Sequence, residues 1–267
     1  MVMSNKQLRI VYAGDRDIAV KVLRFIMEDG IKPVALLVST TDRATHANEL
    51  IDLCGHLDAK LIFYGNELNN ANCMSLLSNL QPDLIIAVHF PYIFKRELLE
   101  IPKRGVVNLH PAYLPYNRGW HTPSWVILDD TPFGATLHFM VEEVDIGDII
   151  HQKPLPVLPN DTANSLYQRV KDLEFEVFCE AWPSIVAGDY RKIPQNRMAG
   201  TTHGKKDLFS PHVQLIDLDE RVKAGDLITR LRALTTNNVN EAAYYVIGGI
   251  RYRIQVCITA DDNVRAN

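Results

Sequence analysis

The sequence lacks several features that mark whole classes of protein. It has only four cysteines in 267 residues (Cys54, Cys73, Cys179 and Cys257), and none of them form a Cys-x-x-Cys pair. This spacing matches neither a cysteine zinc site nor a disulfide framework, so we expect reduced thiols and no metal. No apolar run approaches the roughly 20 residues that a membrane-spanning helix needs. We therefore expect a cytoplasmic protein that has no membrane partner.

Positive charge is not in surplus. The chain has 28 Lys and Arg against 32 Asp and Glu, which gives a net charge of −4. Nucleic acids are bound through clustered Lys and Arg, so this balance argues against a nucleic-acid partner. The first apolar run ends in a single glycine, Gly14, and does not have the G-x-G-x-x-G pattern of a dinucleotide site.

Apolar runs and helical patterns alternate over the first hundred residues. The patterns predict strands over 8–14, 33–39, 61–64, 84–88 and 105–109, and helices over 18–27, 46–57 and 70–80. Such alternation with short connections predicts an α/β fold, with a Rossmann-like, mostly parallel sheet and helices on both faces.

The second half of the chain predicts an extension of this sheet and an appendage. Strands are expected over 134–139 and 149–153, with a long helix over 162–187. The composition becomes polar and irregular after about residue 192. We therefore predict a catalytic domain over 1–200 and a subdomain over 201–267, with a helix and a hairpin that turns at Gly248-Gly249. This subdomain is too small for a core of its own, so it must pack on the main domain or on another subunit.

Three polar residues are candidates for chemistry. Asn108 and His110 end the fifth predicted strand, where open parallel sheets bind their ligands. Asp145 lies in a loop between two strands predicted to be neighbours, so it should reach the same rim. An imidazole can take a proton from an amine, an amide N–H can hold an oxyanion, and a carboxylate can orient the imidazole. This set suits direct transfer of a small acyl group. The spacing alone also fits a strand end, a loop histidine and a turn.

Two motifs add a family resemblance. Residues 108–115 (Asn-Leu-His-Pro-Ala-Tyr-Leu-Pro) with Gly119, followed by residues 145–148 (Asp-Ile-Gly-Asp), resemble the formyltransferases that use 10-formyltetrahydrofolate. By this resemblance the catalytic residues are Asn108, His110 and Asp145, and 10-formyltetrahydrofolate is the co-substrate.

The runs 115–120, 218–221 and 230–235 are similar to the nucleotide-sugar members of that family. This likeness implies that the acceptor is the amino group of a dTDP-linked 3- or 4-amino-dideoxyhexose. The product would be a formamido sugar for surface polysaccharide such as O-antigen. The likeness also implies a homodimer built by the hairpin tail.

The resemblance implies contact residues as well. The folate would lie against Val88, His89, Phe90, Pro91, Tyr92 and Asp145, and Pro91 stands where some relatives carry Lys. The sugar nucleotide would contact Tyr116, Asn117, Arg118, Gly119 and Trp120, with Arg16 near the diphosphate. Each set also has a plainer interpretation, as loop scaffold, packing or solvated helix start. His138 has no partner at metal-ligand spacing and is interpreted as structural or exposed.

Other functions remain open from the sequence. The acceptor could be methionyl-tRNA or glycinamide ribonucleotide, although the acidic balance and the lack of a large basic C-terminal domain argue against tRNA. The protein could also hydrolyse formyltetrahydrofolate, or bind nucleotide sugar or folate without catalysis. Neither the position of the amine nor the choice among dTDP, GDP and UDP carriers follows from the residues.

Overall fold

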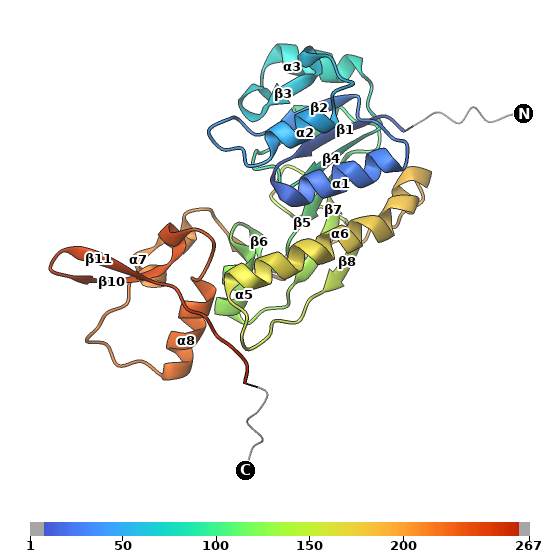
Figure 1. The fold of residues 1–267 in the computed structure, drawn as a ribbon. Coiled ribbons are helices and arrows are strands. Elements are labelled where there is room, and N and C mark those ends of the chain that lie inside the picture. The colour runs from blue at the N-terminus through green and yellow to red at the C-terminus, as the bar shows by residue number, and fades with distance from the viewer. Residues whose placement is uncertain (1–7, 262–267) are drawn as a thin grey trace, which may run out of the picture. The chain divides into compact units, whose positions relative to one another are not determined.

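The computed structural model describes residues 8–261, and a seven-stranded sheet organises the N-terminal half (Figure 1). The strands run in the order β3-β2-β1-β4-β5-β7-β8. Their bounds are β1 (Ile10–Gly14), β2 (Ala35–Val38), β3 (Ile62–Tyr64), β4 (Leu84–Val88), β5 (Val106–His110), β7 (Gly134–Phe139) and β8 (Ile149–Pro154). Neighbours from β3 to β5 pair in parallel, whereas β7 pairs with β5 antiparallel. The predicted fold class is confirmed.

Helices cover both faces of this sheet. They are α1 (Arg16–Glu28), α2 (Ala47–Leu53), α3 (Ala71–Asn79), α4 (Arg96–Leu99) and α6 (Ala163–Ala187), whereas α5 (Thr122–Asp129) packs elsewhere. Val11 and Ile85 point to the face that packs on α3 and α4. Tyr12 points to the opposite face, where its hydroxyl donates to the carbonyl of Ala19 in α1 at 2.7 Å. Side chains that alternate along buried strands therefore explain why the strands are apolar throughout.

The remaining strands and α-helices are short. They are β6 (Arg118–Gly119), β9 (Thr202–His203), α7 (Pro211–Gln214), α8 (Ala224–Ala233), β10 (Ala243–Ile247) and β11 (Ile250–Ile254). A small apolar cluster joins Trp125 of α5 to Leu208, Leu234 and Ala243. The tail thus buries its apolar side chains against α5, as expected for a segment without a core of its own.

The chain forms two compact units. The first comprises the described residues up to 110, then 136–152 and 174–195; the second comprises 111–135, 153–173 and the described residues from 196. This division interleaves along the sequence and does not follow a single cut at residue 200. The assignment of 1–200 and 201–267 as domains therefore stays a prediction.

Within residues 8–261, no helix has both the length and the apolar character needed to cross a membrane.

Asp15 is the main polar anchor at the carboxyl end of β1. Its fully buried carboxylate accepts hydrogen bonds from the backbone N–H groups of Arg16 (2.8 Å), Thr45 (3.0 Å) and His46 (3.2 Å), and from the Ser39 hydroxyl (3.1 Å). Burial acts to raise the pKa of Asp15, but these donors outweigh it and hold the pKa below its ordinary value. The carboxylate therefore caps α1 and fixes the loop after β2.

Replacing Asp15 with Ala should lower the free energy of unfolding by about 2–4 kcal/mol at pH 7, because a cap is lost and several donors stay buried without an acceptor. A carboxylate with a depressed pKa stabilises the fold fully above pH 4, roughly its unfolded pKa. This stabilisation is lost as the pH falls through the folded value. Urea unfolding of both proteins should therefore show a difference that narrows below about pH 4. An Asp15→Asn control, which keeps a carbonyl acceptor but removes the charge, should show a smaller cost that also narrows below about pH 4, because only the wild-type side chain titrates. A wild-type-minus-Ala difference that is constant with pH contradicts this.

Candidate active site

Side chains from two antiparallel strands meet at the end of β5. Asn108 stands opposite His138 of β7, and His110 stands opposite Thr136. Directly opposed residues in an antiparallel pair point to the same face, so Asn108, His110 and His138 share one side of the sheet. Asn108 Nδ2 lies 3.3 Å from His138 Nε2.

Asp145 joins this group from the loop between β7 and β8. One carboxylate oxygen lies 3.5 Å from His110 Nε2, and the other lies 3.5 Å from His138 Nε2. The three side chains are 12%, 7% and 0% exposed respectively, so their charges are poorly screened by water. The three catalytic candidates predicted from the sequence are thus brought together, with His138 as a fourth member.

The contact of His138 with Phe139 defines which ring nitrogen carries a proton when the ring is neutral. Nδ1 lies 2.8 Å from the carbonyl oxygen of Phe139 and must donate to it, because a carbonyl only accepts. A neutral His138 therefore presents a lone pair at Nε2, which accepts from the Asn108 amide. A protonated His138 would instead donate from Nε2 to Asp145. The neutral ring fixes the Asn108 amide with its nitrogen toward the cluster.

The backbone of the Asp145 loop is tightly constrained. Asp145 has φ +56°, a left-handed conformation that costs a residue with a side chain free energy. A Cβ atom on Gly147 would come 1.9 Å from the carbonyl oxygen of Phe139, so only glycine fits there. Phe139 N donates to the carbonyl of Asp148 at 2.8 Å and closes the loop at its base. The Asp-Ile-Gly-Asp motif is therefore explained by the geometry of this loop.

The segment predicted to bind folate follows β4. Val88 ends the strand and is buried, and Pro91 is half-buried. His89, with φ +50°, places Nε2 2.8 and 2.9 Å from the two carboxylate oxygens of the fully buried Glu174 in α6.

The aromatic residues of this segment are anchored too. The rings of Phe90 and Tyr92 lie 5.0 Å apart, and the Tyr92 hydroxyl accepts from Thr40 N at 3.1 Å. Parallel β1, β4 and β5 end on one edge of the sheet, so the segment after β4 shares its rim with His110. Arg16, with φ +71°, is exposed on the same rim at the start of α1.

Residues 116–120, which were predicted to bind the sugar nucleotide, belong to the second unit. Asn117 is fully buried, donates from Nδ2 to Thr131 at 2.7 Å and accepts from Thr201 at 3.1 Å. Arg118 is also buried and donates to the carbonyl of Ala199 at 3.2 Å. These two side chains support the loop from within.

The other residues of this run are less buried than Asn117 and Arg118. Gly119 has φ +92°, and a Cβ there would come 2.3 Å from the carbonyl oxygen of His203. Trp120 is 38% exposed, with Lys205 Nζ 4.7 Å from its ring centroid. Tyr116 is half-buried. Of residues 116–120, Trp120 is therefore the most open to a ligand.

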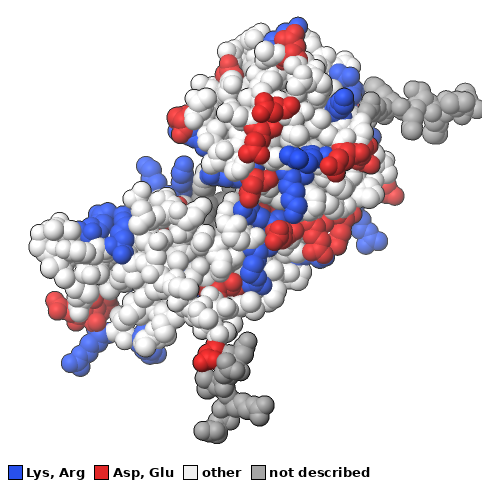
Figure 2. Space-filling model, in the orientation of Figure 1, with Lys and Arg blue, Asp and Glu red and all other residues white. Residues whose placement is uncertain are grey.

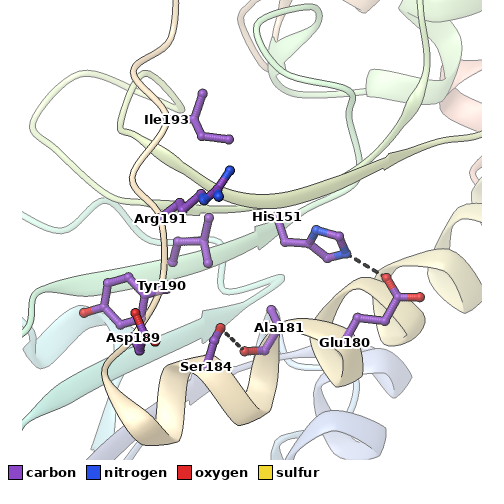
Figure 3. Close-up of a pocket in the computed structure, with 9 residues that line it drawn as sticks. His151, Glu180, Ala181, Ser184, Asp189, Tyr190, Arg191 and Ile193 are labelled. Atoms are coloured by element: carbon purple, nitrogen blue, oxygen red, sulfur yellow. Dashed lines mark hydrogen bonds and ion pairs between the residues drawn. The ribbon is translucent and has the colours of Figure 1, made fainter.

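A separate cleft of about 330 Å³ lies between β8, α6 and the segment that follows α6 (Figure 3). It is lined by Ile150, His151, Glu180, Ala181, Ser184, Asp189, Tyr190, Arg191 and Ile193. His151 Nε2 and a Glu180 carboxylate oxygen are 2.7 Å apart at its edge. The cleft shares no residue with the cluster around Asp145.

The participation of His138 was missed by the sequence analysis, which treated it as structural or exposed. A usable signal was present, because Thr136 and His138 alternate along a predicted strand in the same way as Asn108 and His110 do. Recognising it required the antiparallel pairing of β5 with β7, which the sequence pattern does not specify.

Comparison with known proteins identifies the family. A family model described as formyl transferase matches residues 10–182, which is more than half of the chain. The chain belongs to the formyl transferase family. It is therefore an enzyme that transfers a one-carbon group. A second model, the N-formyltransferase dimerization C-terminal domain, matches residues 211–260.

Individual relatives include sugar and tRNA enzymes. The dTDP-4-amino-4,6-dideoxyglucose formyltransferase of Mycobacterium tuberculosis is 32% identical over 69% of this chain and 76% of its own length. The methionyl-tRNA formyltransferase of Halalkalibacterium halodurans is 26% identical over 85% of this chain and 72% of its own. A sugar N-formyltransferase structure from Shewanella has a TM-score of 0.81 and 23% identity, and the match covers 96% and 99% of the two chains. The last match concerns the fold.

The geometry of His138 leads to a prediction for this formyltransferase. Replacing His138 with Leu should lower kcat about 10- to 100-fold, because the Asn108 amide loses the acceptor that orients it, and small displacements are costly in catalysis. His138→Gln, whose amide oxygen can still accept from Asn108, should retain more activity. Steady-state formyl transfer, with thermal unfolding as the check on folding, tests both. Wild-type kcat in the Leu variant contradicts a role for this contact.

Proposed function

We propose that this formyltransferase moves the formyl group of 10-formyltetrahydrofolate to the amino group of a dTDP-linked 3- or 4-amino-dideoxyhexose. The observation that carries the proposal is the Asp145 carboxylate held between His110 and His138 beside Asn108, at the ligand-binding edge of a formyl transferase sheet.

His110 is the proposed general base. Its imidazole takes a proton from the sugar amine as the amine nitrogen attacks the formyl carbon. The new bond joins the sugar nitrogen to that carbon, and the bond from the carbon to the folate nitrogen breaks. His110 then returns the proton to the departing folate nitrogen, so no group becomes attached to the protein.

Asn108 and Asp145 support this transfer. Asn108 can direct an amide N–H at the formyl oxygen as that oxygen gains negative charge, and such a donor matters most where water is scarce. Asp145 lies 3.5 Å from His110 Nε2, so it stabilises the imidazolium that forms and holds the ring in place.

The substrates are assigned to two surfaces. The folate is proposed to lie along the segment from Val88 to Tyr92, whose His89 and Tyr92 side chains are anchored to Glu174 and Thr40. The sugar nucleotide is proposed to use Trp120 for stacking on its base, with Tyr116 and Gly119 beside it and Arg16 for the diphosphate. Asn117 and Arg118 brace the loop that carries Trp120.

The name of the Mycobacterium tuberculosis relative supports a dTDP-linked amino-dideoxyhexose as acceptor. Synthesis of a formamido sugar for surface polysaccharide, in the cytoplasm, completes the proposal. Methionyl-tRNA is the second candidate, supported by the Halalkalibacterium halodurans relative. The net charge of −4 disfavours it, as do the basic and acidic residues interspersed over the face drawn in Figure 2.

The test is an acceptor panel. The protein is incubated with 10-formyltetrahydrofolate and dTDP-, GDP- and UDP-linked 3- and 4-amino sugars, and mass spectrometry detects the gain of one formyl group. We expect product from a dTDP-linked sugar, and at least a 100-fold loss of turnover in His110→Ala and Asp145→Asn. Formylation of methionyl-tRNA or glycinamide ribonucleotide alone would overturn the acceptor assignment. Loss of formyl folate without any amine would indicate a hydrolase.

We also propose a homodimer through the hairpin of β10 and β11. Residues 211–260 match a dimerization domain, and Ile247 and Ile250 are 55% and 59% exposed at its tip. Ile250→Lys should therefore convert the dimer to a monomer in size-exclusion chromatography with light scattering. Met198→Lys is the control, because Met198 is 95% exposed and lies outside 211–260. A dimer that survives Ile250→Lys, or is equally lost in the control, argues against the hairpin as interface.

A further inference from the structure

Gln195 reaches the catalytic loop from the segment that follows α6. Ile193, labelled in Figure 3, forms a two-way backbone bridge with Ile149, with N–H to carbonyl distances of 2.8 and 2.9 Å. This bridge aligns the segment with the start of β8. Gln195 Nε2 then donates to the carbonyl of Asp145 at 2.9 Å and to the carbonyl of Gly147 at 2.7 Å.

The position of Gln195 Nε2 requires a hydrogen-bond donor, because two carbonyl oxygens face it. The Oε1 atom of Gln195 is buried and has no hydrogen-bond partner among the described residues, a state that costs free energy. Turning the amide over would direct Oε1 at two carbonyl oxygens, which is worse. The amide orientation is therefore set by the catalytic loop.

The two bonds span the strained part of that loop. Asp145 has φ +56°, and the carbonyls that Gln195 holds belong to Asp145 itself and to Gly147, two residues on. A non-glycine residue keeps a left-handed conformation only where its surroundings enforce it. The two hydrogen bonds from Gln195 hold the backbone in this conformation. The position of the Asp145 carboxylate depends on that backbone.

We propose that Gln195 is a positioning residue for the formyl transfer: it holds the Asp145 backbone so that the carboxylate stays between His110 and His138. This inference rests on the proposed function. Gln195 is not predicted to touch either substrate. Its loss should therefore lower kcat while KM for both substrates changes by less than about threefold, since the interaction matters in the transition state and not in binding.

Two substitutions and one matched control test the proposal. Gln195→Leu removes the donor and should lower kcat about 10- to 100-fold. Gln195→Glu keeps the shape but removes the amide N–H groups. Gln214→Leu is the control, because buried Gln214 likewise donates from Nε2 to two carbonyls, of Asn240 at 2.8 Å and Ala242 at 3.4 Å. The control should retain wild-type kcat per folded molecule.

The Gln195→Glu variant adds a dependence of kcat on pH, which a general loss of order in the loop would not produce. Burial beside two carbonyl oxygens should raise the pKa of a glutamic acid above its ordinary value of about 4.3. Once protonated, its O–H can donate to one of the two carbonyls. The ratio of Gln195→Glu kcat to Gln195→Leu kcat should therefore rise as the pH falls from 8 to 6, because both variants lose the amide donor and only the glutamic acid regains one when it is protonated.

A measurement without turnover separates this proposal from the assignment of the acceptor. With ¹⁵N-labelled histidine, the NMR titration of the His110 ring, assigned by loss of its signal in His110→Gln, should shift in Gln195→Leu toward that of Asp145→Asn. A wild-type titration in Gln195→Leu would overturn the proposal even if transfer to a sugar is found. A shifted titration supports it even if the acceptor is another amine. Equal loss of kcat in Gln214→Leu, or a rise in KM alone, would also overturn it.

Discussion

The candidate site depends on one shared carboxylate. Asp145 lies 3.5 Å from the Nε2 atoms of both His110 and His138, and almost every constraint around it serves this placement. The antiparallel pairing of β5 with β7 sets the two imidazoles on one face. The close approach of Gly147 to Phe139 and the contacts of Gln195 shape the loop that brings the carboxylate between them. The sheet thus supplies two of the partners, and a single tight loop supplies the third.

Much of this fold follows from pattern alone. Apolar runs such as 84–88 and the helical spacing of 18–27 predict strands and helices within a few residues of β4 and α1, because buried parallel strands and amphipathic helices have distinct periodicities. Asn108 and His110 were predicted to point into the cleft for the same reason. Their convergence with Asp145 does not follow from neighbouring strands alone, because β7 runs antiparallel to β5 and its loop leaves Phe139 beside Val107, not at the end of β5 where His110 lies.

The features that the sequence did not predict depend on contacts between residues far apart in the chain. The antiparallel direction of β7, and with it the partnership of His138 with Asn108, has no local signature. Nor does the burial of Asn117 and Arg118, which lie in a run whose resemblance predicts ligand contact but whose hydrogen bonds go to residues some fourteen to eighty-four positions away. Gln195 lies in a stretch that the composition marks only as polar and irregular. Local patterns specify elements, whereas these contacts are specified by how distant segments meet.

Two imidazoles around one acid have an electrostatic consequence. With Asp145 ionised and both rings neutral, the cluster carries a single negative charge in surroundings from which water is largely excluded. When one ring takes up a proton, the cluster becomes neutral overall. In the proposed transfer, the proton that His110 takes from the amine therefore forms an ion pair with Asp145, so the step leaves no unpaired charge in this buried place.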